Sequence, residues 1–452
     1  MKSINPANNQ LIREYKEHTE DEVRQIIGSV QLAWLSWKET SFDYRSGLFS
    51  KAAIILREHK EELARLMTME MGKIIRESRA EIEKCAVCCD YFAANTANLL
   101  QDQIIPSDAS RSFVTFQPLG VILAVMPWNF PFWQVFRFAV PSIMAGNAAV
   151  LKHASNVPGC SLAIEEIFRQ AGFPENIFRS LMIPSPMVEA VLAHPYIMAA
   201  TLTGSESAGS QVASAAGKYI KKTVLELGGS DAFIVMEDAD LETAVSTAIT
   251  ARMLNQGQSC IAAKRFIVME SVAEEFTAKL KKGLEILKIG DPLETDTQVG
   301  PMARPDLVND IDRQVKASIE AGAILVTGGK PAEGPGCYYL PTILKEIKKN
   351  MPVYYEETFG PVVSIITVSS EEKAILVAND SPFGLGGSVW TTNLKRGEAI
   401  ARKIETGAVF VNGLTKSDPR LPFGGIKKSG YGRELADYGI REFVNIKTIW
   451  IV

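Results

Sequence analysis

The feature of this sequence that most constrains its fold is a repeated alternation of short apolar runs with segments of helical periodicity. Each run is continuously apolar, as in a strand that is buried on both faces of a parallel sheet. The runs of the first half lie at 119–125, 148–151, 198–202 and 232–236, and the helical segments between them lie at 158–170, 183–193 and 206–220. Strands separated by helices are typical of βαβ units. The sequence therefore predicts a parallel α/β sheet.

A second series of the same kind begins after residue 260. Its apolar runs lie at 266–269, 324–326, 362–368, 388–390 and 408–411, with helix-like stretches at 272–287, 305–321 and 394–405. A chain of 452 residues has room for two or three domains of about 150 residues each. We therefore expect a second α/β domain, with a boundary near the glycine pair at 228–229.

The segment before the first sheet is expected to be mainly helical. Thr19 and Glu22 have the spacing of a capping box, and apolar residues follow them at helical intervals. More helix is expected between residues 45 and 100. Residues 112–116 then alternate in polarity, which is typical of an antiparallel strand.

Composition and charge exclude several classes of protein. Hydrophobic residues make up 46% and charged residues 22%, which excludes a disordered or collagenous chain. The net charge of −4 leaves no basic footprint, so no nucleic-acid partner is expected. None of the four histidines stands at ligand spacing from another, and the cluster Cys85, Cys88 and Cys89 has no matching second pair. We expect buried, inert thiols and no metal site.

Two segments indicate where in the cell the protein is located. Residues 1–10 lack the apolar core of a secretory signal. The stretch between Arg111 and Arg137 carries no charge, but its three prolines indicate a strand, a loop and a helix start rather than a membrane span. We expect no membrane partner and a cytoplasmic location.

A cysteine and a glutamate are the candidate reactive groups. Cys260 ends the polar, glycine-containing segment at 255–260, whereas a structural cysteine normally has apolar neighbours. A thiol needs an activating group, because the thiolate is its reactive form. Glu226 is a lone acid among apolar residues and glycines, a setting that raises a carboxyl pKa and suits a general base. An inert thiol and a buried ion pair are the alternatives for the two residues.

A nucleotide site has a weaker signal. The pattern G-x-G-x-x-G is absent at every expected strand end. Gly204 and Ser205 follow the apolar run 198–202 and precede a helical segment, so free N–H groups at the helix start have the placement to bind a pyrophosphate. The alternative is a glycine turn followed by a serine cap.

Five ordered motifs resemble those of the aldehyde dehydrogenase superfamily. They are PWNFP at 127–131, VLELGG at 224–229, GQSC at 257–260, ETFGP at 357–361 and PFGG at 422–425. Within the superfamily, the chain resembles most the short bacterial succinate-semialdehyde dehydrogenases, through residues 128–138, 151–156 and 417–423.

The resemblance implies an architecture of two Rossmann-like parallel-sheet α/β domains plus a small β oligomerisation element. It places a cofactor-binding domain at 1–227, with a bridging hairpin near 103–118, and a catalytic domain at 228–425. The segment 426–452 is expected to contribute to oligomerisation, in a homodimer or a homotetramer.

The resemblance also implies the chemistry. Cys260 is expected to add to an aldehyde carbonyl, and its backbone N–H is expected to stabilise the oxyanion together with the side chain of Asn129. Glu226 is expected to activate the water that hydrolyses the resulting thioester. The implied reaction is NAD(P)-dependent oxidation of succinate semialdehyde to succinate. The alternatives are another small aldehyde, such as glutarate semialdehyde, and an inactive homologue.

The remaining implied residues bind the cofactor and the substrate. The expected cofactor residues are Trp128, Lys152, Ser155, Gly204, Ser205, Glu357 and Phe359. Many relatives carry a glutamate where this chain has Ser155, and losing that charge favours the 2′-phosphate of NADP over NAD. Arg137 is expected at the mouth of the aldehyde tunnel, facing a substrate carboxylate with Ser417; its alternative is a structural ion pair. His153 is expected at the surface.

Overall fold

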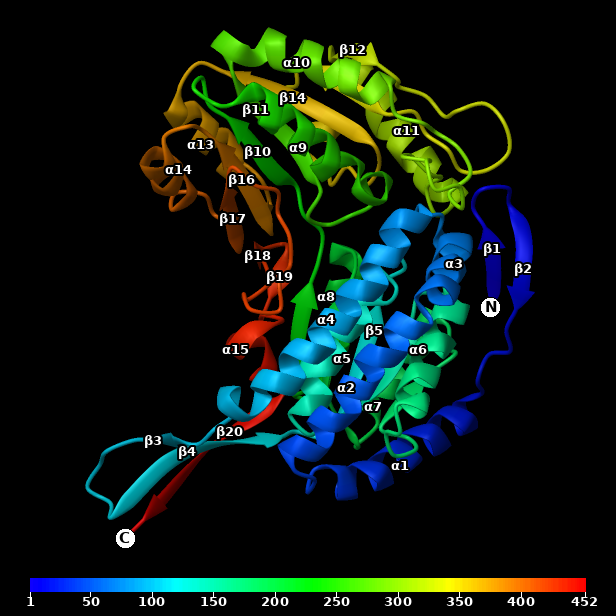
Figure 1. Ribbon diagram of the computed structural model, residues 1–452, viewed down its shortest axis with the longest axis vertical. Helices are drawn as coiled ribbons and strands as arrows, with labels where there is room; N and C mark the ends of the chain where they lie inside the picture. The colour runs from blue at the N-terminus through cyan, green and yellow to red at the C-terminus, as the bar shows by residue number, and fades with distance from the viewer.

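The computed structural model describes all residues, 1–452, and contains two large sheets (Figure 1). The first sheet has the strand order β19-β9-β8-β5-β6-β7, and all its pairs are parallel except β19 with β9. Its strands are β5 (Val121–Met126), β6 (Ala148–His153), β7 (Phe178–Ser180), β8 (Ile197–Thr203), β9 (Lys222–Glu226) and β19 (Gly430–Tyr431).

Helices from the first half of the chain surround this sheet. They are α1 (Glu20–Trp37), α2 (Phe42–Glu58), α3 (Lys60–Met71), α4 (Ile75–Leu99), α5 (Trp133–Met144), α6 (Pro158–Gln170), α7 (Val188–Ala193) and α8 (Glu206–Lys218). The capping box predicted at the start of α1 is confirmed, since Thr19 and Glu22 each bond the other's backbone N–H. The long helix α4 packs against α2, α3 and α5, and it carries Cys85, Cys88 and Cys89 on its buried face.

The second sheet has the order β12-β13-β14-β11-β10-β16-β17 and is parallel except for β12 with β13. Its strands are β10 (Asp231–Val235), β11 (Ala263–Met269), β12 (Ile324–Thr327), β13 (Thr342–Lys345), β14 (Val362–Val368), β16 (Gly386–Trp390) and β17 (Ala408–Val411). Its helices are α9 (Leu241–Met253), α10 (Glu270–Glu285), α11 (Pro305–Glu320), α12 (Pro352–Tyr355), α13 (Glu371–Asn379) and α14 (Leu394–Ala401).

A three-stranded antiparallel ribbon projects from the body of the molecule (Figure 1). It joins β3 (Gln103–Ile104) and β4 (Arg111–Pro118) to the C-terminal strand β20 (Val444–Ile451), which pairs with β4 along its whole length. The smaller elements are β1 (Lys2–Asn5) with β2 (Gln10–Glu14), β15 (Phe383–Gly384) with β18 (Ile426–Lys427), and helix α15 (Ala436–Ile440).

The predicted parallel α/β architecture is confirmed, and the remaining differences are local. The helix expected over 183–193 is limited to α7, because Pro184 and Pro186 confine the preceding residues to a short 3-10 turn. The chain leaves the first sheet at Glu226 and enters the second at Asp231, so the two sheets meet near residues 227–230. No helix is both long and apolar enough to cross a bilayer.

Candidate active site

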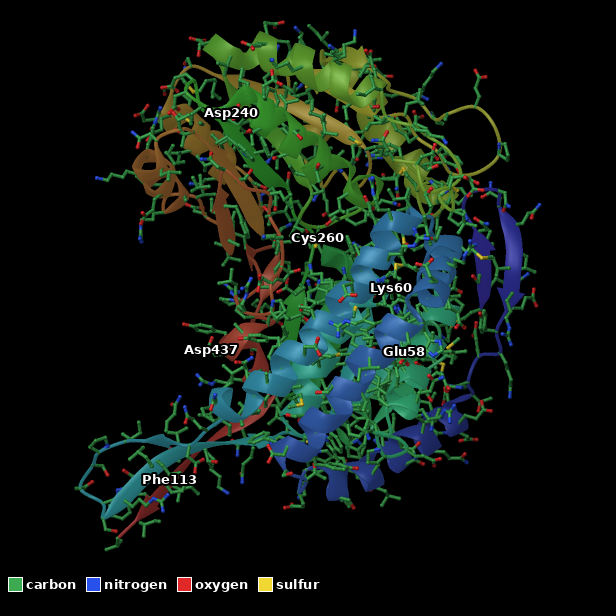
Figure 2. All side chains as sticks on the ribbon, in the orientation of Figure 1. Glu58, Lys60, Phe113, Asp240, Cys260 and Asp437 are labelled. Carbon is green, nitrogen blue, oxygen red and sulfur yellow. The ribbon has the colours of Figure 1, made fainter.

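Cys260 lies where the two halves of the molecule meet, on the loop that leads into β11 (Figure 2). The loop follows a 3-10 turn in which Asn255 and Gln256 both have left-handed backbone angles, with φ of 51° and 53°. Gly257 continues this path at φ 73°, and a Cβ there would collide with the Gly360 carbonyl. Glycine is therefore required at this position, and the turn sets the direction in which Cys260 emerges.

Two buried cations hold the cysteine loop from inside. The Lys264 ammonium donates to the carbonyls of Ser259 (2.9 Å) and Cys260 (2.7 Å), and it lies 3.5 Å from the Glu357 carboxylate. The Arg252 guanidinium donates to the carbonyls of Gly257 and Thr358, which ties the loop to the segment that carries Glu357. The position of the thiol is thus fixed by backbone contacts.

The Cys260 thiol is neutral in this state. The residue keeps partial solvent exposure, whereas the other five cysteines are buried. Burial of the sulfur is the main cause that raises its pKa to about 12, and the nearby cations Arg137 and Lys264 lower the pKa by less. A neutral thiol must lose its proton before it can attack a carbonyl. The site therefore needs a proton acceptor.

Asn129 lies beside this loop, in the segment that connects β5 to α5. Its Oδ1 accepts from the Gln134 side chain at 3.1 Å, and its Nδ2 donates to the Gln258 carbonyl at 3.1 Å. The Asn255 side chain in turn donates to the Asn129 carbonyl at 2.8 Å. The amide of Asn129 is thus oriented with its N–H groups toward the cysteine loop, as an oxyanion donor requires.

His153 is not at the surface, so this expectation was wrong. It is 4% exposed, and its Nε2 donates to the Pro131 carbonyl at 2.8 Å. Burial lowers its pKa to about 4. The neutral imidazole thus holds the loop that carries Asn129 through a hydrogen bond. This contact explains why a polar residue stands at the end of the apolar strand β6.

Glu226 is the last residue of β9 and is 2% exposed. Neither of its carboxyl oxygens has a hydrogen-bond partner, and it forms no ion pair. Burial, reinforced by the nearby Glu434, raises its pKa well above the ordinary value. A Cβ on Gly424 would lie 2.6 Å from Oε1 of Glu226, so the glycine at this position keeps the space beside the carboxyl open. An unbonded carboxyl with a raised pKa is suited to accept a proton from water.

Arg137 does not lie at an open tunnel mouth, and its expected placement requires correction. The side chain is 2% exposed and its guanidinium forms a buried ion pair with Glu434. It also donates to Thr203 Oγ1 at 3.2 Å and lies 4.6 Å from the centroid of the Phe423 ring. The sequence gives no sign of this pairing because Glu434 is almost 300 residues away. The structural ion pair is thus the alternative that the geometry favours.

Ser417 has a cationic partner that the sequence did not indicate. It is 7% exposed, and its Oγ accepts a hydrogen bond of 2.7 Å from the Lys84 ammonium on α4. Lys84 also lies 4.2 Å from the centroid of the Trp133 ring at the start of α5. Ser417, which the sequence predicted as a site residue, is therefore in direct contact with Lys84, which it did not predict.

Glu357, Phe359 and Trp128 lie close to the cysteine loop. The Trp128 and Phe359 rings meet edge to face, with centroids 5.8 Å apart, and the Arg304 guanidinium lies 5.5 Å from the Trp128 centroid. Glu357 accepts from the Gly229 N–H at 2.9 Å and is held near Lys264. These contacts hold a carboxylate beside the cysteine loop and pack Trp128 against Phe359.

Two cavities adjoin Ser155 and Ser185, the hydrogen-bond partner of Lys152. A cavity of 490 Å³ lies between α7 and α8 and is lined by apolar residues, such as Val188 and Leu202, and by polar ones, such as Gln211 and Lys218. A second one of 660 Å³ is lined by polar groups that include Ser155 and Arg304. Ser185 lines both, and it accepts from the Lys152 ammonium at 3.2 Å.

Gly204 and Ser205 begin α8 at the end of β8. The Ser205 hydroxyl accepts from the Ala208 N–H at 3.3 Å, so the alternative of a glycine turn with a serine cap describes the local geometry. The cap leaves the remaining first-turn N–H groups of α8 directed outward.

No cluster of three or more His, Cys, Asp or Glu side chains is placed to hold a metal ion.

Comparisons with known proteins agree with these motifs. The model of the Aldehyde dehydrogenase family matches residues 1–449. A probable succinate-semialdehyde dehydrogenase (NADP(+)) from Synechocystis sp. is 54% identical over 99% of both chains, and succinate-semialdehyde dehydrogenase (NADP(+)) 1 from Mycobacterium bovis is 47% identical over 99% of both. The crystal structure of succinic semialdehyde dehydrogenase from Streptococcus pyogenes, in complex with NADP+, superposes with a TM-score of 0.98 at 39% identity, covering 100% of this chain and 99% of that one. This chain therefore belongs to the aldehyde dehydrogenase family.

Proposed function

We propose that this protein oxidises succinate semialdehyde to succinate, with NADP as the preferred hydride acceptor and NAD as a second one. The observation that carries the proposal is the meeting of a partly exposed thiol, an oriented amide and an unbonded carboxyl, supplied by Cys260, Asn129 and Glu226. Relatives of 47–54% identity that are named for this substrate and for NADP support it.

The residues divide the reaction into two steps. In the first, the partly exposed Cys260 thiol gives its proton to solvent water and its sulfur adds to the aldehyde carbon, while Asn129 Nδ2 and the Cys260 N–H donate to the oxyanion. One such donor is typically worth about 3–4 kcal/mol. A bound nicotinamide would supply the acceptor for the hydride of this carbon. In the second step, Glu226 takes a proton from water, the hydroxide adds to the thioester, and the C–S bond breaks to release the acid.

The residues around the two cavities fit a dinucleotide with a 2′-phosphate. The cavity between α7 and α8 has apolar side chains at Val188, Leu202 and Val212, against which a flat base can pack. At its junction with the second cavity, the Lys152 ammonium has no carboxylate partner, and burial lowers its pKa. Next to Ser155, both side-chain polar atoms of Asn156 are buried without partners. Positively charged groups and unpaired hydrogen-bond donors that lie close together are suited to bind a phosphate. Glu357 is proposed to hold the nicotinamide ribose, and Phe359 with Trp128 to pack beside the ring.

The preference for NADP is expected to depend on Ser155. In Ser155→Glu, kcat/KM with NADP should fall at least tenfold while that with NAD falls less or rises, because a carboxylate repels the 2′-phosphate and accepts from a 2′-hydroxyl. The measurement is initial-rate kinetics with each cofactor at saturating aldehyde, and Ser155→Ala is the matched control without charge. An unchanged ratio of the two cofactors would remove Ser155 from this role.

A second candidate substrate is another small aldehyde that ends in a carboxylate, such as glutarate semialdehyde. The same catalytic groups would serve both. Absorbance at 340 nm with a panel of aldehydes, each tried with NADP and NAD, tests the proposal directly. A higher kcat/KM for glutarate semialdehyde would transfer the assignment, and no activity on any aldehyde would favour an inactive homologue.

We also propose that the protein is a homodimer or a homotetramer. The ribbon of β3, β4 and β20 projects from the body and exposes large apolar side chains at Ile104, Ile446 and Trp450, each more than half exposed. One edge of the ribbon is β20, whose outer backbone groups have no neighbouring strand. An open apolar edge requires a cover, and a second copy of the same ribbon provides one.

The oligomer is tested by light scattering at micromolar concentration, with a mass of two or four chains as the expected result. Charges at two exposed positions, in Ile446→Lys with Trp450→Glu, should shift the mass toward one chain. A monomer mass for the unaltered protein would contradict the proposal.

We propose a cytoplasmic location and the domain roles given by the resemblance. Six cysteines without a disulfide fit a reducing compartment. The division into a cofactor-binding domain at 1–227 and a catalytic domain at 228–425 is supported by the placement of the 490 Å³ cavity beside the first sheet and of Cys260 beside the second.

A further inference from the structure

The peptide unit between Ser259 and Cys260 has one polar group held inside the protein and one that is free. Its carbonyl accepts a hydrogen bond of 2.9 Å from the Lys264 ammonium. Its N–H, which is the Cys260 N–H, donates to no other group of the protein. Because the peptide is trans, its carbonyl and its N–H point in opposite directions. The contact with Lys264 therefore directs the Cys260 N–H away from the side of the turn on which the ammonium lies.

Lys264 holds the rest of this turn as well. It is the second residue of β11, and its side chain is buried beneath the turn. Its ammonium also donates to the carbonyls of Cys260 at 2.7 Å and of Ala262 at 3.3 Å. The Ser259 carbonyl accepts in addition from the Ala262 N–H at 3.2 Å. Three carbonyls of one turn thus converge on one ammonium, which fixes the planes of the peptides that flank Cys260.

The charge of Lys264 is supported by two carboxylates. Burial lowers its pKa, and Glu357 and Asp231 oppose this effect. The nearer of the two is Glu357, whose Oε1 lies 3.5 Å from the ammonium. A hydrogen bond from a charged donor polarises the peptide that accepts it, so the N–H on the other side of that peptide becomes a stronger donor. A neutral side chain in the same place would orient the peptide with little of this polarisation.

Resting on the proposed function, we propose that Lys264 is a positioning residue for the oxyanion, because it directs the Cys260 N–H and strengthens it as a donor. Lys264 does not itself touch the substrate, since its ammonium lies beneath the turn. The other oxyanion donor, the side chain of Asn129, is held separately through Gln134. A lysine that only stabilised the loop would affect every reaction of the thiol alike. The proposed role affects the reactions that pass through an oxyanion.

Two reactions of Cys260 separate these roles without any cofactor. In acylation by p-nitrophenyl acetate, the sulfur adds to the ester carbonyl, an oxyanion forms, and nitrophenolate leaves as the C–O bond breaks. In alkylation by iodoacetamide, the sulfur displaces iodide from a saturated carbon, and no oxyanion forms. Both reactions need the thiolate. Burial raises the pKa of this thiol and Lys264 lowers it in part, but that influence cancels in the ratio of the two rates.

In Lys264→Met, the ratio of the acylation rate to the alkylation rate should fall by roughly 10- to 100-fold, less than the loss for removal of a whole oxyanion donor. Arg265→Met is the matched control, because Arg265 is also buried in β11 but donates to the carbonyls of Ser230, Val377 and Ala378. Its ratio should stay within twofold of wild type. A Lys264→Met ratio within twofold of wild type, or an equal fall in Arg265→Met, would overturn the inference.

A second measurement follows hydride transfer in a single turnover, with enzyme in excess over succinate semialdehyde and NADP at saturation. The rate of the absorbance rise at 340 nm, divided by the alkylation rate, should fall in Lys264→Met by a similar factor. A wild type that is acylated and alkylated at Cys260 but reduces NADP with no aldehyde would overturn the proposed function, and the acylation ratio would still decide the role of Lys264.

If Lys264→Met does not fold, Lys264→Gln takes its place. Its amide can still donate to the Ser259 carbonyl but carries no charge, so the ratio of acylation to alkylation should fall by roughly 3- to 30-fold. A Lys264→Gln ratio within twofold of wild type would show that the charge is not needed and would overturn the inference.

Discussion

Glu226→Gln is expected to produce one rapid equivalent of reduced cofactor per active site and then to turn over about 10²- to 10⁴-fold more slowly than wild type. The first step needs the thiol and the oxyanion donors, which the substitution leaves in place. The second step needs a group that accepts a proton from water, and an amide cannot do so. Stopped-flow absorbance at 340 nm separates the burst from the steady rate.

Cys260→Ala is the matched control, because it removes the nucleophile and should abolish both phases. The two variants together distinguish a missing base from a missing nucleophile. Normal steady turnover in Glu226→Gln would exclude Glu226 as the base.

The pH dependence of the slow step has a predictable sign. Burial and the nearby Glu434 raise the pKa of Glu226 well above its ordinary value, so its carboxylate form is reached at a higher pH than in an ordinary glutamate. Since only the carboxylate can act as a base, thioester hydrolysis should accelerate as pH rises. This acceleration should disappear in Glu226→Gln, and a pH-independent slow step in the wild type would contradict the assignment.

Arg137→Met is expected to destabilise the protein by about 3–5 kcal/mol, the usual cost of removing one member of a buried ion pair. The substitution leaves the Glu434 carboxylate buried without its partner and within electrostatic reach of Glu226. The measurement is the urea midpoint at one fixed protein concentration. Activity on charged and uncharged aldehydes should fall together.

A second substitution separates the ion pair from the arginine stem. In Arg137→Met with Glu434→Gln, the buried charge is gone, and much of the lost stability should return, because replacing both members of a buried pair is often close to neutral. Two results would instead indicate that Arg137 binds the substrate directly. One is a free energy of unfolding of Arg137→Met within about 1 kcal/mol of wild type. The other is a loss of activity in Arg137→Met only on the carboxylate-ended aldehyde.

The sequence predicted the fold well because the information for it is local. The runs that became β5, β6, β8, β10, β11 and β14 are continuous and apolar, and the helices between them carry their own periodicity. The strand β13 and the helix α13 were not anticipated, since β13 is four residues long and α13 is short and weakly amphipathic. Family motifs then identified Cys260, Glu226 and Asn129, which the structure brings to one place.

The side chains that hold these groups were harder to anticipate. Lys264 and Arg265 stand directly before the apolar run 266–269, within what became β11, and cations in such a strand are a signal that could have been followed. Glu434 and Lys84 gave none, because their partners Arg137 and Ser417 are about 300 residues away in the chain. Contacts between residues so far apart in the chain depend on how the strands and helices are arranged in space, and a local sequence pattern does not contain that information. His153 was misplaced for a related reason, since its two backbone partners become visible only once β6 lies beside β5.

The pairing of β19 with β9 has a consequence for how the protein is made. The strand that completes the first sheet next to Glu226, and the Glu434 that neutralises Arg137, both come from the last part of the chain. During synthesis the N-terminal elements can collapse first, but these contacts have high sequence separation and form slowly. The nucleophile is thus translated long before its base acquires its surroundings. A nascent chain therefore lacks the full surroundings of Glu226 until the ribosome has released the C-terminal segment.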